Sequence, residues 1–449
     1  MQEFLKKLQS KGERIAVIEN ESVFTYANLY KKIEQFLVEF EKSGIKGGQV
    51  VILYGDYSFY SIALLLALAA NKNIVVPITK IPAQELDERK QESNAEWLIF
   101  VNDSDFQLER LQSAEKHHII SQLNTQSRSG LILFSSGMTG KPKAMIHDFD
   151  NLVSVYLDKR GRELVFLVFL LFDHIGGINT LLNTLSMGSS IVIPERREPD
   201  YICQLIEKHK IGVLPSSPTF LNLLLMNLKD RKYDLSSLIM ITYGTEPMPE
   251  SLLIRVKEHF PKVKLLQTFG TSETGIAKTS SQSSVSTLMK IEDGDTQYRI
   301  VDGELWLKSK TQIIGYLNYS MDSFTEDGWF KTGDLAEQTT DGFIRILGRL
   351  KEVINVGGEK VLPAEIESVI MQLPEVDDCV AYAIPNMITG QSVGLNVTSS
   401  HADEKNLKKL IRSHCKERLE PYKIPVKINL LDKLEFNSRF KKVRIRKES

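Results

Sequence analysis

Apolar runs of strand length alternate with amphipathic stretches of helix length through the first three quarters of the chain, and this order constrains the fold most. Six runs are expected to be buried strands, at 50–53, 74–77, 97–101, 131–134, 191–193 and 238–242. Four stretches are expected to be helices between them, at 26–42, 58–70, 199–208 and 218–229. Such alternation predicts an α/β fold with mainly parallel sheets, flanking helices and right-handed crossovers.

Two changes of pattern follow. Glycines separate short alternating runs over residues 284–347, which predicts a small antiparallel β part that closes the first domain. After Arg349 come a Gly-Gly pair, a helix opened by Pro363, strands near 379–383 and a helix over 403–419. We therefore expect a large N-terminal domain at 1–348 and a small α+β C-terminal domain at 349–449.

Composition excludes several classes of protein. Lys and Arg total 56 against 57 for Asp and Glu, so no overall field favours nucleic acid or an anionic membrane. The longest apolar stretches, 62–70 and 164–172, are shorter than the roughly 20 residues that span a bilayer. The three cysteines show no paired spacing and the first 30 residues do not resemble a signal peptide, so a cytoplasmic protein without a membrane span is expected.

Directly after the run at 131–134, residues 135–143 read Ser-Ser-Gly-Met-Thr-Gly-Lys-Pro-Lys. Small residues let backbone N–H groups converge on phosphate oxygens, while hydroxyls and lysines add donors and charge. It is not a Walker loop, since no Gly-Lys-Ser/Thr follows at the required spacing. An ordinary Gly/Ser turn remains open on these residues alone.

The segment resembles the phosphate loop of the adenylate-forming superfamily, which includes acyl- and aryl-CoA ligases, luciferases and peptide-synthetase adenylation domains. Further motifs follow in the order of that family, from residue 135 to residue 444. Met138 and Ala144 depart from its usual pattern. The resemblance implies ATP binding by the loop residues Ser135, Ser136, Gly137, Thr139, Gly140 and Lys143.

Three further motifs complete the nucleotide site that the resemblance implies. In 243–247 (Tyr-Gly-Thr-Glu-Pro), the residues Gly244, Thr245 and Glu246 line the adenine side. In 269–273 (Phe-Gly-Thr-Ser-Glu), Phe269 stacks on adenine beside Gly270, Ser272 donates to the α-phosphate and Glu273 helps to hold Mg²⁺, a hard cation that prefers oxygen ligands. In 328–335, Asp334 accepts from both ribose hydroxyls, because each carboxylate oxygen can take one hydrogen bond, and Arg349 contacts the ribose as well.

The resemblance also implies a mobile C-terminal domain. It would turn about a hinge at Lys351 between an adenylating pose and a thiol-transferring pose. Residues 437–444 resemble the catalytic-lysine motif of the family, which places Lys441 as the catalytic lysine, although Phe440 replaces the usual Gly and Lys442 is an adjacent competitor. After adenylation, the loop at Gly357 and Gly358 would face the active site and admit the thiol.

The sequence constrains the carboxylic acid and the thiol of the implied reaction less than it constrains the nucleotide. The segment 172–177 resembles an acyl-pocket motif and contributes Asp173, His174 and Gly177, with Asp173 keeping an amino-acid substrate open. Coenzyme A is the first expectation for the thiol, because 353–367 resembles the CoA-ligase version of the motif. Phosphopantetheine on a carrier protein is the alternative, and an inactive nucleotide-binding homologue is the third reading. The sequence leaves the carboxylic acid and the oligomeric state open.

Overall fold

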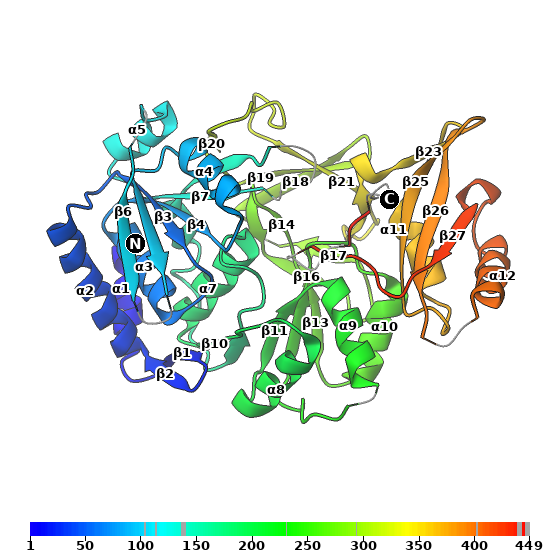
Figure 1. The fold of residues 1–449 in the computed structure, drawn as a ribbon, viewed down its shortest axis with the longest axis horizontal. Coiled ribbons are helices and arrows are strands. Elements are labelled where there is room, and N and C mark those ends of the chain that lie inside the picture. The colour runs from blue at the N-terminus through cyan, green and yellow to red at the C-terminus, as the bar shows by residue number, and fades with distance from the viewer. Residues whose placement is uncertain are drawn as a thin grey trace.

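The structure is a computed structural model, and it describes residues 1–102, 105–112, 115–135, 141–229, 231–292, 294–400, 403–437 and 442–444. Figure 1 shows a large N-terminal domain of sheets and helices beside a smaller C-terminal domain, drawn in orange and red. This arrangement confirms the expected fold class. Among the described helices, none is both long enough and apolar enough to cross a membrane.

The sheet that carries the phosphate loop has seven strands in the order β20-β8-β7-β4-β3-β5-β6. Its strands are β3 (Val50–Tyr54), β4 (Ile74–Ile78), β5 (Trp97–Val101), β6 (Phe106–Arg110), β7 (Gly130–Phe134), β8 (Ala144–Asp148) and β20 (Gly315–Tyr316). The inner strands β7, β4, β3 and β5 run parallel, whereas β8, β20 and β6 pair antiparallel. The expected loop therefore joins two antiparallel neighbours, β7 and β8.

A second seven-stranded sheet has the order β13-β12-β11-β9-β10-β1-β2. Its strands are β1 (Ile15–Glu19), β2 (Ser22–Thr25), β9 (Val165–Leu167), β10 (Ser190–Ile193), β11 (Val213–Ser216), β12 (Met240–Tyr243) and β13 (Lys264–Gln267). All neighbours are parallel except β1 and β2. Parallel strands buried on both faces read as continuous apolar runs, which is why the sequence pattern found β10 and β12 of this sheet.

Helices cover both sheets of the large domain. They are α1 (Gln2–Gln9), α2 (Tyr26–Ser43), α3 (Phe59–Ala70), α4 (Ala83–Glu92), α5 (His118–Thr125), α6 (Phe149–Ser154), α7 (Ile175–Met187), α8 (Pro199–His209), α9 (Pro218–Leu228) and α10 (Glu250–His259). Helix α3 is apolar on all sides and buried along nearly its whole length, against α2, β3 and β4. Each fully buried Leu in it contributes roughly 1.5–3 kcal/mol by leaving water.

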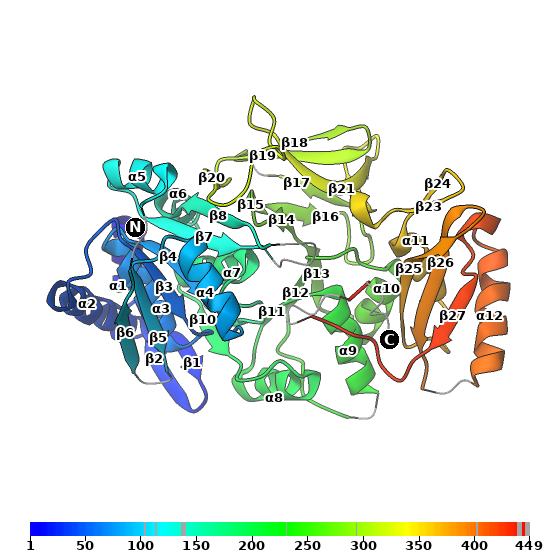
Figure 2. The same ribbon diagram turned by 45° about the horizontal axis from the view of Figure 1, so that its top comes forward.

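An antiparallel part follows, as the glycine pattern predicted. The hairpin of β14 (Phe269–Thr271) and β15 (Gly275–Ala277) precedes a six-stranded sheet. That sheet contains β16 (Thr279–Ser281), β17 (Met289–Ile291), β18 (Thr296–Val301), β19 (Glu304–Ser309), β21 (Phe330–Gln338) and β22 (Ile344–Arg349). Figure 2 shows it above the parallel sheets.

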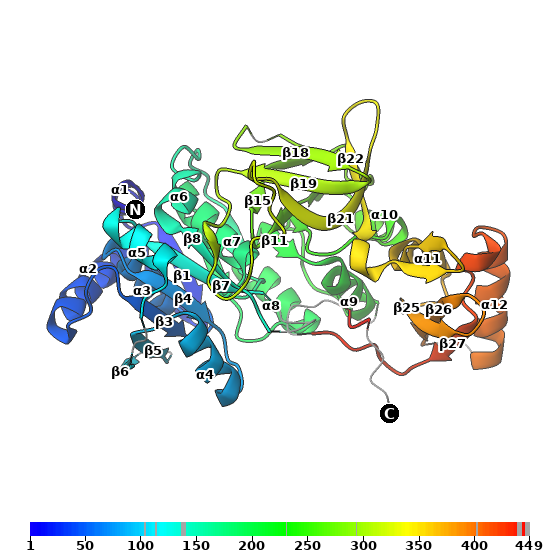
Figure 3. The same cartoon turned by 90° about the horizontal axis from the view of Figure 1, so that it is seen from above.

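The C-terminal domain has its own apolar core, built from residues between Ile354 and Ile428. Its sheet contains β23 (Ile354–Val356), β24 (Glu359–Val361), β25 (Asp378–Asn386), β26 (Gly390–Thr398) and β27 (Lys427–Leu430). The helices are α11 (Pro363–Ile370) and α12 (Glu404–Lys416), with short 3₁₀ turns η1 (Leu350–Glu352) and η2 (Pro421–Lys423). Figure 3 shows the segment after β27 leaving this domain and running toward the large one.

The strand and helix predictions are largely confirmed, with differences at several boundaries; the helix expected at 403–419, for example, forms α12 over Glu404–Lys416. The run expected at 238–242 forms β12 only from Met240, because Leu238 and Ile239 belong to the segment that joins the turn at 236–237 to the strand. Strand β8 was not predicted, since it begins directly after the loop and ends on the polar pair His147 and Asp148. Strands β9 and β11 were also missed, and both are only three or four residues long.

Candidate active site

The neck of the phosphate loop is closed by two hydrogen bonds. The N–H of Ser135 donates to the carbonyl of Lys143 at 3.1 Å, and the N–H of Lys143 donates to Oγ of Ser135 at 2.9 Å. The two described ends of the loop, Ser135 and Lys143, are therefore held together where β7 ends and β8 begins. Four of its predicted phosphate ligands lie outside the described residues, namely Ser136, Gly137, Thr139 and Gly140.

Lys143 keeps its ammonium available for an anion. Its Nζ lies 4.0 Å from the ring centre of Tyr319 and 5.0 Å from that of Tyr316. Within the part of the chain that the structure describes, it forms no ion pair. A cation held on aromatic faces is positioned without being neutralised.

The predicted adenine-side segment follows β12. Gly244 has no room for a side chain, because a Cβ there would lie 2.6 Å from Oγ1 and 2.7 Å from the carbonyl oxygen of Thr268. Thr245 has a left-handed backbone with φ of 74°. Oε1 of Glu246 accepts from the N–H of Thr219 at 2.7 Å, so this carboxylate caps the start of α9.

The segment 269–273 lies in the hairpin of β14 and β15, with Ser272 and Glu273 in its turn. Gly270 packs directly against the facing strand, where a Cβ would lie 2.3 Å from the carbonyl oxygen of Gly275. Phe269 is partly buried against the core of the antiparallel sheet. Oε1 of Glu273 accepts from the hydroxyl of Tyr316 at 3.1 Å, which orients the carboxylate.

Glu273 is the residue whose chemistry fits a magnesium ion. The described residues contain no group of three or more His, Cys, Asp or Glu side chains placed to hold a metal. Mg²⁺ commonly takes one or two carboxylates and completes its shell with phosphate oxygens and water. A single oriented carboxylate is therefore compatible with a metal that arrives with the nucleotide.

Asp334 and Arg349 form an ion pair across β21 and β22. Nε of Arg349 lies 2.7 Å from Oδ1 of Asp334, which is 5% exposed. Arg349 also donates to the carbonyl of Thr332 at 3.1 Å. The two residues assigned to the ribose are thus brought together, immediately before the predicted hinge residue Lys351, which lies exposed in η1.

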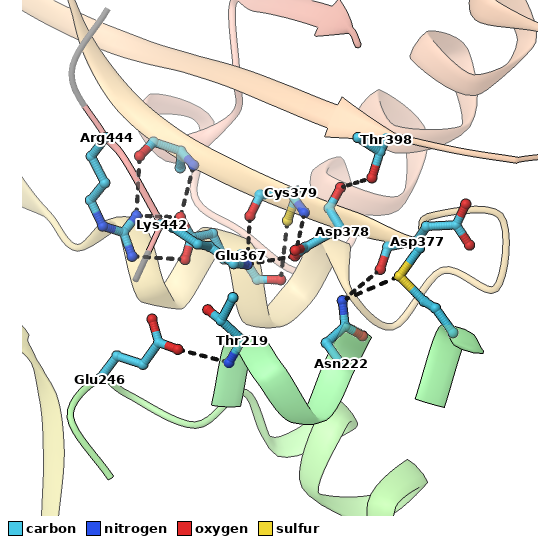
Figure 4. A network of polar contacts seen from close by, with 12 residues as sticks. Thr219, Asn222, Glu246, Glu367, Asp377, Asp378, Cys379, Thr398, Lys442 and Arg444 are labelled. Atoms are coloured by element: carbon cyan, nitrogen blue, oxygen red, sulfur yellow. Dashed lines mark hydrogen bonds and ion pairs between the residues drawn. The ribbon is translucent and has the colours of Figure 1, made fainter. Parts of the chain in front are cut away.

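The tail motif returns to the C-terminal domain, where Phe436 pairs antiparallel with Lys442. Nζ of Lys442 lies 2.5 Å from Oδ1 of Asp378 and 2.9 Å from the carbonyl oxygen of Cys379 (Figure 4). Burial disfavours the charge of Lys442, but the nearby Asp378 and Glu367 outweigh it and raise its pKa above the ordinary value. Lys442 is therefore committed to a contact inside its own domain.

Arg444 joins the tail to the start of the C-terminal domain. Its guanidinium pairs with both oxygens of Glu367, and Nε lies 3.2 Å from Oε2 of Glu352. Burial disfavours the charged guanidinium, but the attraction of Glu367 outweighs the effect of burial. The pKa of Arg444 therefore lies above its ordinary value. The predicted catalytic residue Lys441 lies outside the described residues.

A cavity of about 410 Å³ lies between the two domains. The large domain contributes Glu246 and Pro247 of the adenine-side segment, together with Ile346 of β22. The C-terminal domain contributes Glu367 and Arg444. Segments nearly two hundred positions apart in the sequence thus line one space.

The expected acyl-pocket residues lie at the start of α7. Nδ1 of His174 accepts from the N–H of Gly176 at 3.0 Å, so the ring caps this helix. Oδ2 of Asp173 accepts from the hydroxyl of Thr79 at 2.9 Å. At Gly177 a Cβ would lie 2.1 Å from the carbonyl oxygen of Leu171 and 2.8 Å from the hydroxyl of Tyr57. Neither Thr79 nor Tyr57 was singled out from the sequence.

The expected thiol-channel glycines form the tight turn between β23 and β24. Gly357 and Gly358 have φ of 62° and 98°, a conformation that favours glycine. The N–H of Gly358 donates to Oδ1 of Asn355 at 3.0 Å. Figure 2 shows the hairpin of β23 and β24 apart from β14.

Comparison with protein-family models gives two matches. Residues 4–317 match the family described as AMP-binding enzyme, and residues 365–441 match the AMP-binding enzyme C-terminal domain. Among curated relatives, a 2-succinylbenzoate–CoA ligase of Bacillus licheniformis is 26% identical over 472 aligned residues, which cover 96% of each chain. A probable CoA ligase of Humulus lupulus is 28% identical and covers 82% of this chain and 77% of its own.

Solved structures share the fold. The o-succinylbenzoate CoA synthetase of Bacillus subtilis, in complex with its acyl-adenylate intermediate, superposes with a TM-score of 0.75 at 22% identity, covering 98% of this chain and 96% of its own. ATP-bound MatB of Rhodopseudomonas palustris gives a TM-score of 0.80 at 20% identity, covering 97% and 96%.

Proposed function

The chain belongs to the AMP-binding enzyme family, and on that premise we propose that it activates a carboxylic acid with ATP to an acyl-AMP and transfers the acyl group to the thiol of coenzyme A. The interdomain cavity carries this proposal, because the adenine-side residue Glu246 and the tail residue Arg444 line the same space. CoA is the preferred thiol, since relatives that match nearly the whole chain are named CoA ligases.

In the first half-reaction, an oxygen of the carboxylate attacks the α-phosphorus of ATP and pyrophosphate leaves. Asp334 and Arg349 would hold the ribose, while Ser272, Lys143 and the loop 135–143 would hold the phosphates. Bound Mg²⁺ would neutralise phosphate charge, with Glu273 as its protein ligand. Charge builds on the departing phosphates, and Lys441 is the proposed donor that stabilises it. Lys442 is unsuited to that role because it is already paired with Asp378.

In the second half-reaction, the thiol attacks the carbonyl of the acyl-AMP and AMP leaves. We take 1–348 and 349–449 as the units that move relative to each other, with Lys351 as the hinge. Rotation about Lys351 would bring the hairpin of β23 and β24, with Gly357 and Gly358 in its turn, to the thiol path. A mixed anhydride is open to attack by sulfur, whereas the starting carboxylate is not.

The three cysteines of the chain are free and buried, which supports our placing the enzyme in the reducing cytoplasm.

Release of pyrophosphate from ATP, measured with a panel of aliphatic, aromatic and amino acids, tests the proposal. We expect release that depends on one class of acid, followed by thioester formation when CoA is added. A thioester formed only on a phosphopantetheinylated carrier protein would replace CoA as the thiol. If ATP binds and no acid releases pyrophosphate, the chain is a nucleotide-binding protein without this activity.

A further inference from the structure

Two oppositely charged residues of the proposed nucleotide site, Glu273 and Lys143, both contact the side chain of Tyr316. Its hydroxyl donates to Oε1 of Glu273 at 3.1 Å, and its ring centre lies 5.0 Å from Nζ of Lys143. Tyr316 is 4% exposed. A tyrosine hydroxyl is protonated at neutral pH, so it is a donor to the Glu273 carboxylate.

The ring of Tyr319 is the second aromatic ring in contact with the ammonium of Lys143. Its centre lies 4.0 Å from Nζ of Lys143, and the two tyrosine rings meet at 74° with centres 6.1 Å apart. The ammonium thus lies against two aromatic faces at once. Attraction to such faces holds a cation in place without giving it an anionic partner.

Backbone pairing fixes this segment against the loop. Strand β20 pairs with β8, matching Tyr316 with Met145. Asn318 then clamps the end of the phosphate loop, because Oδ1 accepts from the N–H of Ala144 at 2.8 Å and Nδ2 donates to the carbonyl of Pro142 at 2.9 Å. The position of Tyr316 relative to Lys143 is consequently set by the sheet.

Opposite charges this close to a shared neighbour attract each other, yet no ion pair joins Lys143 to Glu273, both of which the structure describes. A direct pair would neutralise the ammonium and the carboxylate before a nucleotide arrived. We propose that Tyr316 is a positioning residue for adenylation, holding Lys143 on its ring and Glu273 on its hydroxyl so that both charges stay available to the nucleotide. This inference rests on the proposed function.

The test is a double-mutant cycle on ATP binding by calorimetry, without metal and without acid. Y316L removes ring and hydroxyl together, so Lys143 and Glu273 are free to pair. We expect ATP affinity to fall about tenfold, by analogy with the smaller losses seen when a residue that orients a metal ligand is removed. In that background E273Q should restore affinity, because Lys143 is released, and the gain should exceed the effect of E273Q in the wild-type background.

Tyr156 provides the matched control. It is also buried, at 7% exposure, and its hydroxyl donates to Oδ1 of Asn179 at 2.7 Å, away from the loop. Y156F should leave ATP affinity unchanged. If E273Q has the same effect in the wild-type and Y316L backgrounds, Tyr316 is only a packing residue and the proposal is wrong. Should Y316L fail to fold, the same cycle with Y316F decides, since loss of the hydroxyl alone frees Glu273.

Steady-state kinetics separates this inference from the proposed function. With the accepted acid, Y316F should raise KM for ATP and the Mg²⁺ concentration that gives half-maximal rate, each several-fold. If the wild type releases pyrophosphate but Y316F matches Y156F in both values, the positioning role fails and the activity stands. If no acid supports release, the activity fails while the binding cycle still decides the role of Tyr316.

Discussion

Asp334 and Arg349 face each other across β21 and β22, with Nε of Arg349 2.7 Å from Oδ1 of Asp334. Replacing the carboxylate by D334A removes the proposed acceptor of the ribose hydroxyls and leaves the guanidinium without this partner. The two hydrogen bonds to this charged group contribute about 1.5–3 kcal/mol each, so ATP affinity should fall by at least roughly 100-fold. Calorimetry with ATP measures this directly.

A control for D334A lies on the same two strands. Glu337 and Arg345 form an exposed pair at 3.5 Å, and E337A should leave ATP affinity unchanged. Equal affinities of D334A and the wild type would remove Asp334 from the nucleotide site.

Strands and helices could be predicted from the sequence wherever burial produces a regular pattern of apolar residues. Strands such as β3 and β4 are apolar throughout because parallel strands have no solvent-facing side. Strand β8 left no such trace, since it is an antiparallel strand whose end carries His147 and Asp148. Its partner β20 has only two residues, so pairing between positions 146 and 315 could not be read locally.

For the site, the family motifs located the individual segments but not the contacts between them. Tyr316 holds Glu273 and lies beside Lys143, and neither contact is visible in a linear pattern. Likewise, adjacent lysines at 441 and 442 are equivalent in sequence until Asp378 is seen to bind one of them. Both relationships depend on tertiary pairing rather than on residue type.

Contacts between α9 and the C-terminal domain stabilise the arrangement of the two domains in this structure, which we propose is the adenylating one. Nζ of Lys229 lies 3.2 Å from Oδ1 of Asp377, and Nδ2 of Asn222 donates to the carbonyl of Asp377 at 3.0 Å. Lys229 is largely exposed, so K229M should cost at most about 1 kcal/mol and slow pyrophosphate release up to about fivefold. Thioester formation from a synthetic acyl-AMP should not slow.

Lys210 supplies a matched control for K229M, because its exposed pair with Asp234 lies within the large domain. K210M should affect neither half-reaction. If K229M instead slows both half-reactions equally, the contact stabilises the protein in general and does not distinguish the two poses.

Stability should depend on pH through His147. This side chain is fully buried, and burial lowers its pKa to about 4 against the opposing effect of the carbonyls of Thr311 and Ser272. Between these two pKa values, the histidine is protonated in the unfolded chain, where its pKa is near 6.5, and neutral in the folded chain. Stability should fall as pH drops from about 6.5 to 4, by roughly 2–4 kcal/mol from this group, and should level off below 4.

Urea unfolding of the wild type and H147N between pH 4 and pH 7.5 measures that contribution. Asn keeps a donor for Thr311 but does not titrate. The difference in unfolding free energy between the two proteins should therefore change with pH over this window. A constant difference would show that the imidazole has the same proton affinity in both states.

The adjacent lysines of the tail should separate into a catalytic and a structural residue. Successive side chains point in different directions, and Lys442 lies 2.5 Å from Oδ1 of the buried Asp378. K441A should slow pyrophosphate release by roughly 100- to 1000-fold, the usual effect of losing one positioned electrostatic donor. It should spare thioester formation from a synthetic acyl-AMP and leave thermal stability unchanged.

K442A should show the opposite profile. Removing one partner of a buried pair leaves Asp378 uncompensated, at a cost of about 3–5 kcal/mol in stability. Adenylation per folded molecule should persist, and D378N in the same chain should recover part of the lost stability, because the uncompensated charge is gone. Thermal unfolding and active-site-normalised rates measure both effects. If K442A abolishes adenylation at unchanged stability while K441A is mild, the register of the tail motif is shifted by one residue, and Asp378 then holds the catalytic lysine in a resting position.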